Sequence, residues 1–186
     1  IDWATLRKEV DVVFDQGANG VVAAMVTEVL RLTDAERDEL IAKIVEFTAG
    51  RGPVIMSVGA ESAAQAKRHA RAAEAAGATA LMAIPPTNTP ASADEVIGYY
   101  EAILGATSLP LVVQDASGYV GAPLPITAQA AMFNRHPDRV MFKPEAQPLG
   151  QNLSLLREAT GGKAPIFEGS GGIALLDSHQ RGVAGT

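Results

Sequence analysis

The chain has 186 residues, 47% hydrophobic and 19% charged, which excludes a disordered protein and fits one globular domain with its own core. Its net charge of −6 argues against a nucleic-acid surface, which needs a basic stripe. The chain has no cysteine, so we expect neither disulfides nor thiolate metal sites. It has no signal-peptide pattern and no apolar stretch of the roughly 18 residues that a membrane helix needs, so we expect a cytoplasmic protein without a membrane partner.

Helix-like and strand-like segments alternate along the chain, beginning with a helix-like segment over residues 3–16. The strand candidates are short, apolar and bounded by glycine or proline, which is typical of parallel strands covered on both faces. These candidates span residues 20–26, 53–58, 78–84, 109–115, 139–143, 164–168 and 183–186. The segments between them are too long for hairpins and suit helical crossovers.

The expected helices carry recognisable start and stop signals. Capping boxes begin at Thr33 and at Ser92, because each is followed three residues later by a glutamate. An alanine-rich segment over 62–76 ends at Gly77, a residue that suits the left-handed turn after a helix. Further helices are expected over residues 126–133 and 152–160.

This alternation fits two α/β architectures, an open doubly wound sheet or most of a (β/α)₈ TIM barrel. No Gly-x-Gly-x-x-Gly fingerprint follows the first strand, which weakens the nucleotide-binding open sheet. A complete barrel has about 250 residues and begins with a strand, whereas this chain begins with a helix-like segment. We therefore predict one domain over residues 1–186, a TIM barrel truncated at both ends that runs from about strand 2 to strand 8.

Lys143 is the most informative residue because it closes an apolar strand, and chemistry in a barrel lies at the carboxyl ends of strands. Burial of a charged amine is costly. A lysine here either becomes a neutral nucleophile that forms a Schiff base with a carbonyl compound, or reaches the rim and pairs with Glu145 or Asp115. The residues alone leave both interpretations open.

Two other strand ends carry polar residues that suit substrate binding. Gln114 can orient a substrate and Tyr119 can transfer a proton, although a surface turn explains both residues equally well. The turn formed by Glu168, Gly169 and Ser170 offers backbone N–H groups to an anion, unless its glycines serve only a tight turn. No histidine pair has the spacing of a helix-borne metal site, so no metal is expected.

Four strand-end sequences occur in a recognisable order. They are the double proline at 85–86, the apolar run at 109–113, Phe-Lys-Pro-Glu-Ala at 142–146 and Ile-Phe-Glu-Gly at 166–169. With them, the chain resembles the dihydrodipicolinate synthase/N-acetylneuraminate lyase family over all 186 residues. The resemblance implies a TIM barrel, a homotetramer, no cofactor, and an imine between Lys143 and a 2-oxo acid.

The chain departs from the family where the family carries Gly-Thr-Thr-Gly-Glu, since the sequence there is Ala-Met-Val-Thr-Glu over 24–28. Val26 and Thr27 are therefore expected to bind the substrate carboxylate through backbone N–H groups. Gln114 stands in place of the family's catalytic tyrosine and cannot transfer a proton, and Tyr119 is not a certain replacement. The lysine-biosynthesis reaction is consequently not expected.

These features predict a class I lyase, either an aldolase or a dehydratase, that acts on a 2-oxo acid or a deoxy sugar acid through Lys143. One alternative is a sugar-phosphate enzyme in which the glycine-rich turn at 169–172 binds the phosphate. The other alternative is a barrel that binds a metabolite without turning it over.

Overall fold

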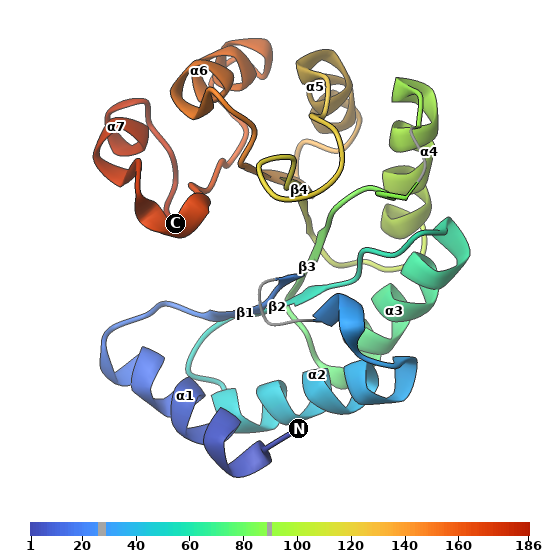
Figure 1. Ribbon diagram of the computed structural model, residues 1–186, viewed down its shortest axis with the longest axis vertical. Helices are drawn as coiled ribbons and strands as arrows, with labels where there is room; N and C mark the ends of the chain where they lie inside the picture. The colour runs from blue at the N-terminus through green and yellow to red at the C-terminus, as the bar shows by residue number, and fades with distance from the viewer. Residues whose placement is uncertain (26–28, 89–90) are drawn as a thin grey trace.

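A curved parallel sheet surrounded by helices forms the body of the protein (Figure 1). The computed structural model describes residues 1–25, 29–88 and 91–186. The strands within these residues are β1 (Val21–Ala23), β2 (Val54–Ser57), β3 (Ala80–Ala83), β4 (Leu111–Asp115) and β5 (Val140–Pro144). They lie in chain order, and every neighbouring pair is parallel, as the alternating pattern predicted.

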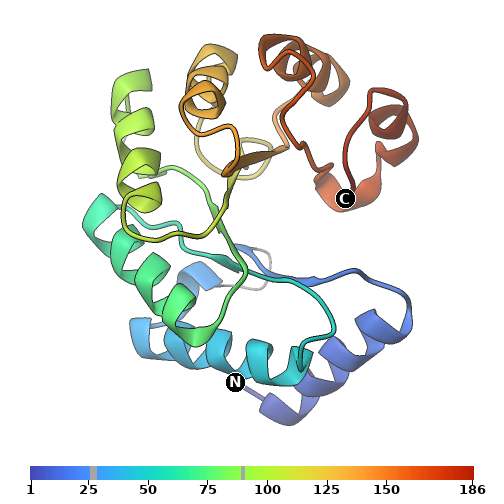
Figure 2. The same cartoon turned by 180° about the vertical axis from the view of Figure 1, so that it is seen from behind.

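Helices connect the strands and lie on the outer side of the sheet in both views (Figures 1 and 2). They are α1 (Trp3–Asp15), α2 (Asp34–Thr48), α3 (Ala63–Ala76), α4 (Ala93–Leu104), α5 (Ile126–Arg135), α6 (Leu149–Ala159) and α7 (Leu175–Gln180), with short 3₁₀ turns η2 (Val29–Arg31) and η3 (Ser170–Gly172). No helix in the described part of the chain has the length and apolar character needed to cross a membrane.

The predicted helix signals are present in the structure. Thr33 and Ser92 each accept a hydrogen bond from the backbone N–H three residues on, and the glutamate at that position bonds back, so both capping boxes are confirmed. Gly77 ends α3 with φ of 95°, which is the left-handed conformation expected after a helix.

The sheet continues beyond β5, but the last two predicted strands are shorter than expected. Phe142 pairs with Ile166, and Phe167 pairs with Gly185, in isolated parallel bridges. Pro165 has no N–H to donate and Gly185 has a low preference for strands, which limits the ladder at this edge. The two segments still occupy the places of the next strands of a barrel.

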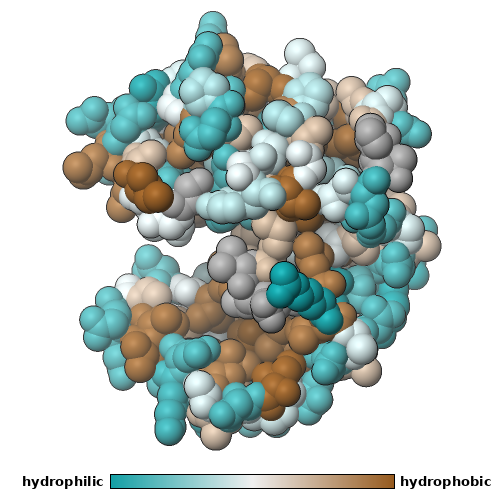
Figure 3. All heavy atoms as spheres, in the orientation of Figure 1, coloured by the Kyte–Doolittle hydropathy of each residue, from teal (hydrophilic) through white to brown (hydrophobic). Residues whose placement is uncertain are grey.

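The barrel is open between β1 and the last segment. Among the described residues β1 pairs only with β2, and the space-filling view in Figure 3 is hollowed on the side between α1 and α7. A groove of about 760 Å³ lies against β1, α1 and α2. Its lining includes the apolar side chains of Leu6, Val10, Val13, Val22, Leu40 and Ile44, and none of the described candidate site residues.

Side chains alternate between the two faces of each strand, which decides where the polar strand ends point. Met56, Leu81, Val113 and Phe142 belong to the apolar core formed with the helices. Their strand neighbours therefore face the opposite, inner side of the sheet. These inward-facing neighbours include Ser57, Met82, Gln114 and Lys143.

Candidate active site

Lys143 lies near the carboxyl end of β5, beside Gln114 of β4 in the sheet register. Its Nζ atom donates a hydrogen bond to Oε1 of Glu145 at 2.8 Å. The side chain of Lys143 is 21% exposed, whereas that of Glu145 is 4% exposed. The amine is therefore partly open to a ligand, while its partner carboxylate is buried.

Glu145 joins β4 and β5 through both its side chain and its backbone. The Nε2 atom of Gln114 donates to Oε2 of Glu145 at 2.6 Å, and Gln114 is itself 2% exposed. The Glu145 N–H donates to the Asp115 carbonyl at 2.9 Å. A buried carboxylate is costly unless its oxygens are hydrogen-bonded, so the amide of Gln114 and the amine of Lys143 together hold Glu145 in place.

The sequence interpretation named Glu145 only as a possible partner for a lysine at the rim. The structure shows that pairing, and it places Lys143 near the carboxyl end of β5, the end of the strands at which barrel enzymes bind their substrates. The signal for Glu145 was its spacing, because residues two apart in an extended chain lie on the same face. Asp115, the other partner considered, instead bonds the loop that follows β4.

Gly169 lies directly against the Glu145 carboxylate. A Cβ atom at Gly169 would overlap Cγ and Oε1 of Glu145, so a larger residue there would have to displace the carboxylate or the turn. Gly171 and Gly172, further along the same turn, adopt positive φ values of 68° and 75°. The glycines thus serve a tight turn, and Gly169 also brings this turn to the Lys143–Glu145 pair.

Glu168 is fully buried immediately before that turn. Its Oε2 atom accepts a hydrogen bond from the Thr186 hydroxyl at 3.3 Å, while Oε1 has no hydrogen-bond partner among the described residues. An unpaired buried carboxyl oxygen is costly and marks a position where a donor would be bound favourably. Ser170 begins the 3₁₀ turn η3, and Val26 and Thr27 lie outside the described residues.

Tyr119 is 62% exposed on the loop over residues 116–125, which follows β4. Asp115 closes this loop by accepting hydrogen bonds from the N–H groups of Ser117 at 3.0 Å and Leu124 at 2.8 Å. A Cβ atom at Gly118 would lie 2.8 Å from the carbonyl oxygen of Glu145, so the loop packs against the Glu145 backbone. Tyr119 therefore sits on an ordered loop that contacts the site, with its ring mostly in solvent.

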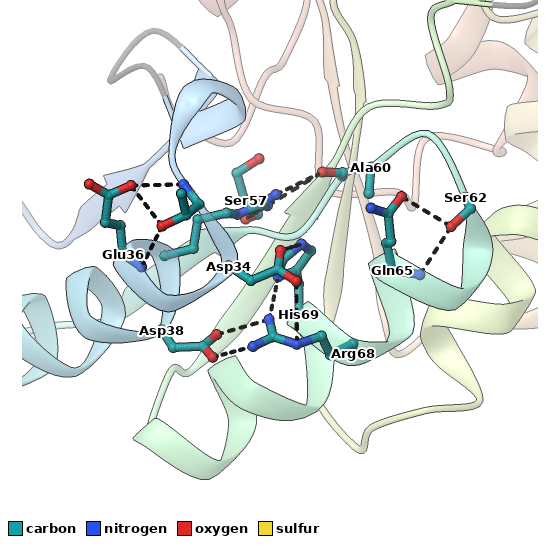
Figure 4. A network of polar contacts seen from close by, with 12 residues as sticks. Asp34, Glu36, Asp38, Ser57, Ala60, Ser62, Gln65, Arg68 and His69 are labelled. Carbon is teal, nitrogen blue, oxygen red and sulfur yellow. Dashed lines mark hydrogen bonds and ion pairs between the residues drawn. The ribbon is translucent and has the colours of Figure 1, made fainter.

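Side chains of α2 and α4 hydrogen-bond the backbone of the loop between β2 and α3, and part of this polar network is shown in Figure 4. Arg37, which is buried, donates to the carbonyls of Ser57 at 2.9 Å and Gly59 at 3.4 Å. Ala60 donates its N–H to the Tyr99 hydroxyl at 2.9 Å, and burial raises the pKa of Tyr99 to about 12. These hydrogen bonds fix the loop next to the carboxyl end of β2.

The model of the Dihydrodipicolinate synthetase family matches residues 1–185. This chain belongs to that family. Its relatives include a probable 5-dehydro-4-deoxyglucarate dehydratase of Ralstonia nicotianae, 38% identical over 64% of this chain and 38% of the relative. They also include an L-2-keto-3-deoxyarabonate dehydratase of Azospirillum brasilense, 29% identical over 100% of this chain and 61% of the relative. The family member described here thus spans less than two thirds of the length of either dehydratase.

Solved structures of the family have the same fold. A putative dihydrodipicolinate synthetase from Pseudomonas aeruginosa superposes with a TM-score of 0.93 at 26% identity, covering 100% of this chain and 63% of the other. A dihydrodipicolinate synthase from Acinetobacter baumannii, in complex with pyruvate, gives a TM-score of 0.92 at 25% identity with the same coverages. The predicted (β/α)₈ barrel, present here in part, is thereby confirmed.

Proposed function

We propose that this protein is a Schiff-base lyase that dehydrates a 2-keto-3-deoxy sugar acid. The observation that carries the proposal is the chain of hydrogen bonds from the Lys143 amine through the Glu145 carboxylate to the Gln114 amide. It supplies a nucleophile next to a proton carrier, on the face of the barrel where chemistry occurs. The relatives named as dehydratases of keto-deoxy acids support the same assignment.

The proposed reaction begins when the Lys143 ammonium gives a proton to Glu145 and the free amine attacks the C2 carbonyl. Loss of water then leaves a protonated imine, which withdraws electrons from C3. Glu145, after releasing its proton to solvent, takes the C3 proton and leaves an enamine. When the C4–O bond breaks, Glu145 returns this proton to the leaving hydroxyl, and water finally hydrolyses the imine to release a 2-oxo acid and Lys143.

The relatives named as dehydratases of keto-deoxy acids favour dehydration over aldol cleavage. Gln114 cannot act as a base in either reaction, because a carboxamide does not titrate. Dehydration requires a proton to move from C3 to the neighbouring hydroxyl, which a single carboxylate can carry. Glu145 is the carboxylate bonded to the nucleophile, so one residue suffices.

Glu168, Gly169 and Ser170 are proposed to bind the hydroxylated chain of the substrate, and Tyr119 to cover it. The Oε1 atom of Glu168 is buried without a partner among the described residues, which suits a donor such as a sugar hydroxyl. Val26 and Thr27 stay predictions for the substrate carboxylate, and the homotetramer stays a prediction from the family resemblance.

A phosphate site at the 169–172 turn is less well supported. The Glu145 carboxylate lies against Gly169, so a phosphate bound there would face a like charge at short range. The Glu145 side chain beside Gly169 is an acceptor, as a hydroxylated substrate requires.

Borohydride reduction in the presence of pyruvate tests the proposal. The expected result is a mass increase on the peptide that carries Lys143, with the peptides carrying Lys67 and Lys163 unmodified as internal controls, and no adduct in the Lys143→Arg variant. A second assay follows water loss from 2-keto-3-deoxypentonate. Absence of an adduct across a broad panel of 2-oxo acids would refute the imine, and binding without product would favour a metabolite-binding role.

A further inference from the structure

The carboxylate of Glu61, on the loop after β2, accepts hydrogen bonds from the loop after β3. Glu61 lies between β2 and α3, and its oxygens accept hydrogen bonds from the Thr87 N–H at 3.1 Å, the Thr87 hydroxyl at 2.9 Å and the Asn88 N–H at 3.1 Å. Partial burial raises the pKa of Glu61, but these hydrogen bonds outweigh it and leave the pKa below its usual value. The ionised carboxylate is therefore the form that ties the loops.

The two loops are also packed closely along their backbones. A Cβ atom at Gly59 would lie 3.1 Å from the nitrogen and 3.2 Å from the oxygen of Ile84, at the end of β3. Pro85 and Pro86 follow and fix the backbone that leads to Thr87. The donors that reach Glu61 are thus presented by a stiff segment rather than by a free loop.

Thr87 has a second contact on its other side. Its methyl group lies 3.5 Å from a Cβ atom placed on Gly121, a residue with φ of +79° in the loop over 116–125. The side chain of Thr87 therefore stands between Glu61 and this loop, with its hydroxyl toward the carboxylate and its methyl group toward Gly121.

The loop over 116–125 carries this contact to the catalytic pair. Gly118 packs on the carbonyl of Glu145, and the N–H groups of Tyr119 and Val120 both donate to the Ala116 carbonyl, at 2.8 Å and 2.9 Å. A line of neighbouring residues thus runs from Glu61 through Thr87 and the loop to Glu145, whereas Lys143 itself is held by the β-sheet.

We propose that Glu61 is a positioning residue of this active site. Acting through Thr87, it fixes the loop that carries Tyr119 against the Lys143–Glu145 pair and so sets the binding of the substrate chain beyond C3. The inference rests on the proposed function for its substrate class. The inference distinguishes two parts of the site: Lys143 of β5 bonds C2 of the substrate, and the loop that carries Tyr119 covers the hydroxylated chain beyond C3.

Three substitutions and one matched control test the proposal. Glu61→Gln replaces one acceptor oxygen with a donor that faces other donors, and Thr87→Val removes the hydroxyl while keeping the methyl group. Thr87→Ser keeps the hydroxyl that bonds Glu61 and removes only the methyl group that faces Gly121. Glu74→Gln is the control, because Glu74 accepts the same two kinds of hydrogen bond, from the Ser108 N–H at 2.8 Å and its hydroxyl at 2.6 Å, before β4 at the opposite end of the sheet.

The kinetic readout compares a long and a short ligand in the full chain. With 2-keto-3-deoxypentonate, Glu61→Gln and Thr87→Val are expected to raise KM roughly 10-fold. This increase corresponds to the loss of about one charge-assisted hydrogen bond. The rate of borohydride trapping with pyruvate stays within about 2-fold of native, since pyruvate has no atoms beyond C3. Thr87→Ser, which keeps the hydroxyl bond to Glu61 but loses the methyl group, is expected to raise KM less than Thr87→Val does, and Glu74→Gln leaves both values unchanged.

A second readout needs no substrate. Amide hydrogen exchange at Tyr119 and Val120 is expected to quicken in Glu61→Gln and Thr87→Val but not in Glu74→Gln. Unchanged exchange and unchanged KM in Glu61→Gln, or equal changes in Glu74→Gln, would overturn the positioning role. If the native protein forms no adduct with any oxo acid, the proposed function fails, while the exchange result still decides whether Glu61 positions the loop.

Discussion

Lys143 and Glu145 are joined by a hydrogen bond of 2.8 Å between Nζ and Oε1, although Pro144 separates them in the chain. The extended backbone at the end of β5 turns both side chains to the same face, and Gln114 of the adjacent strand holds the second oxygen of Glu145. This relationship gives the proposed active site its nucleophile, its proton carrier and its support, and each part can be tested separately.

Glu145→Gln is expected to lower kcat on the order of 10²- to 10⁴-fold, because an amide of the same shape cannot carry a proton between C3 and the leaving hydroxyl. Borohydride trapping at Lys143 should persist at a reduced rate, since the amine remains. Steady-state dehydration and peptide mapping measure the two effects. A kcat within a few-fold of native would remove Glu145 from the mechanism.

Gln114→Leu is expected to destabilise the fold by about 1–3 kcal/mol, because it removes a hydrogen bond of 2.6 Å that the buried Glu145 carboxylate accepts. Chemical denaturation measures the free energy of unfolding. Gln151→Leu is the control, since Gln151 is exposed on α6 and its replacement should change stability by less than about 0.5 kcal/mol. Equal effects at the two positions would contradict the support that we assign to Gln114.

Gly169→Ala is expected to disrupt the site, because the added Cβ atom would overlap Cγ of Glu145 and must push the turn or the carboxylate aside. We expect a cost of about 1–3 kcal/mol and a loss of turnover. Gly98→Ala in α4 is the matched control, since nothing lies within 4 Å of its Cβ position and a mid-helix alanine stabilises by up to about 1 kcal/mol. Thermal unfolding and kcat distinguish the two variants.

His69 predicts a pH dependence of stability. Burial, and next the charge of Arg37, lower the pKa of His69 below its usual value, although Asp34 at 3.4 Å acts in the opposite direction (Figure 4). Because the folded state holds the proton less tightly than the unfolded state, stability is full above pH 6.5 and falls as the pH drops below it. Unfolding free energies at pH 5 to 8 measure this.

The His69→Gln variant removes the titrating group and should flatten that pH dependence between pH 7 and 5. The other charged groups of the network, Asp38 and Arg68, are unchanged in this variant and serve as the background. The same pH slope in both proteins would show that His69 does not control it.

Local sequence determined the elements of this protein. Both capping boxes and the glycine after α3 formed as predicted, because each depends on residues within about four positions of one another. The alternation of apolar strands and helices likewise predicted the parallel sheet, and the order of the strand-end motifs predicted the family. The last two strands were over-predicted, because bridges at a sheet edge depend on neighbouring strands rather than on local preference.

The contact between Gln114 and Glu145 was decided by the tertiary structure. Gln114 and Glu145 are 31 residues apart and meet only because the β4–β5 register sets Gln114 beside Lys143. The fit of Gly169 against Glu145 depends on how the turn after Phe167 packs on β5. The sequence by itself therefore determined that Lys143 stands at a strand end with Glu145 as a possible partner. The strand register decided that Gln114 supports this carboxylate, since contacts between distant segments follow from packing rather than from local preference.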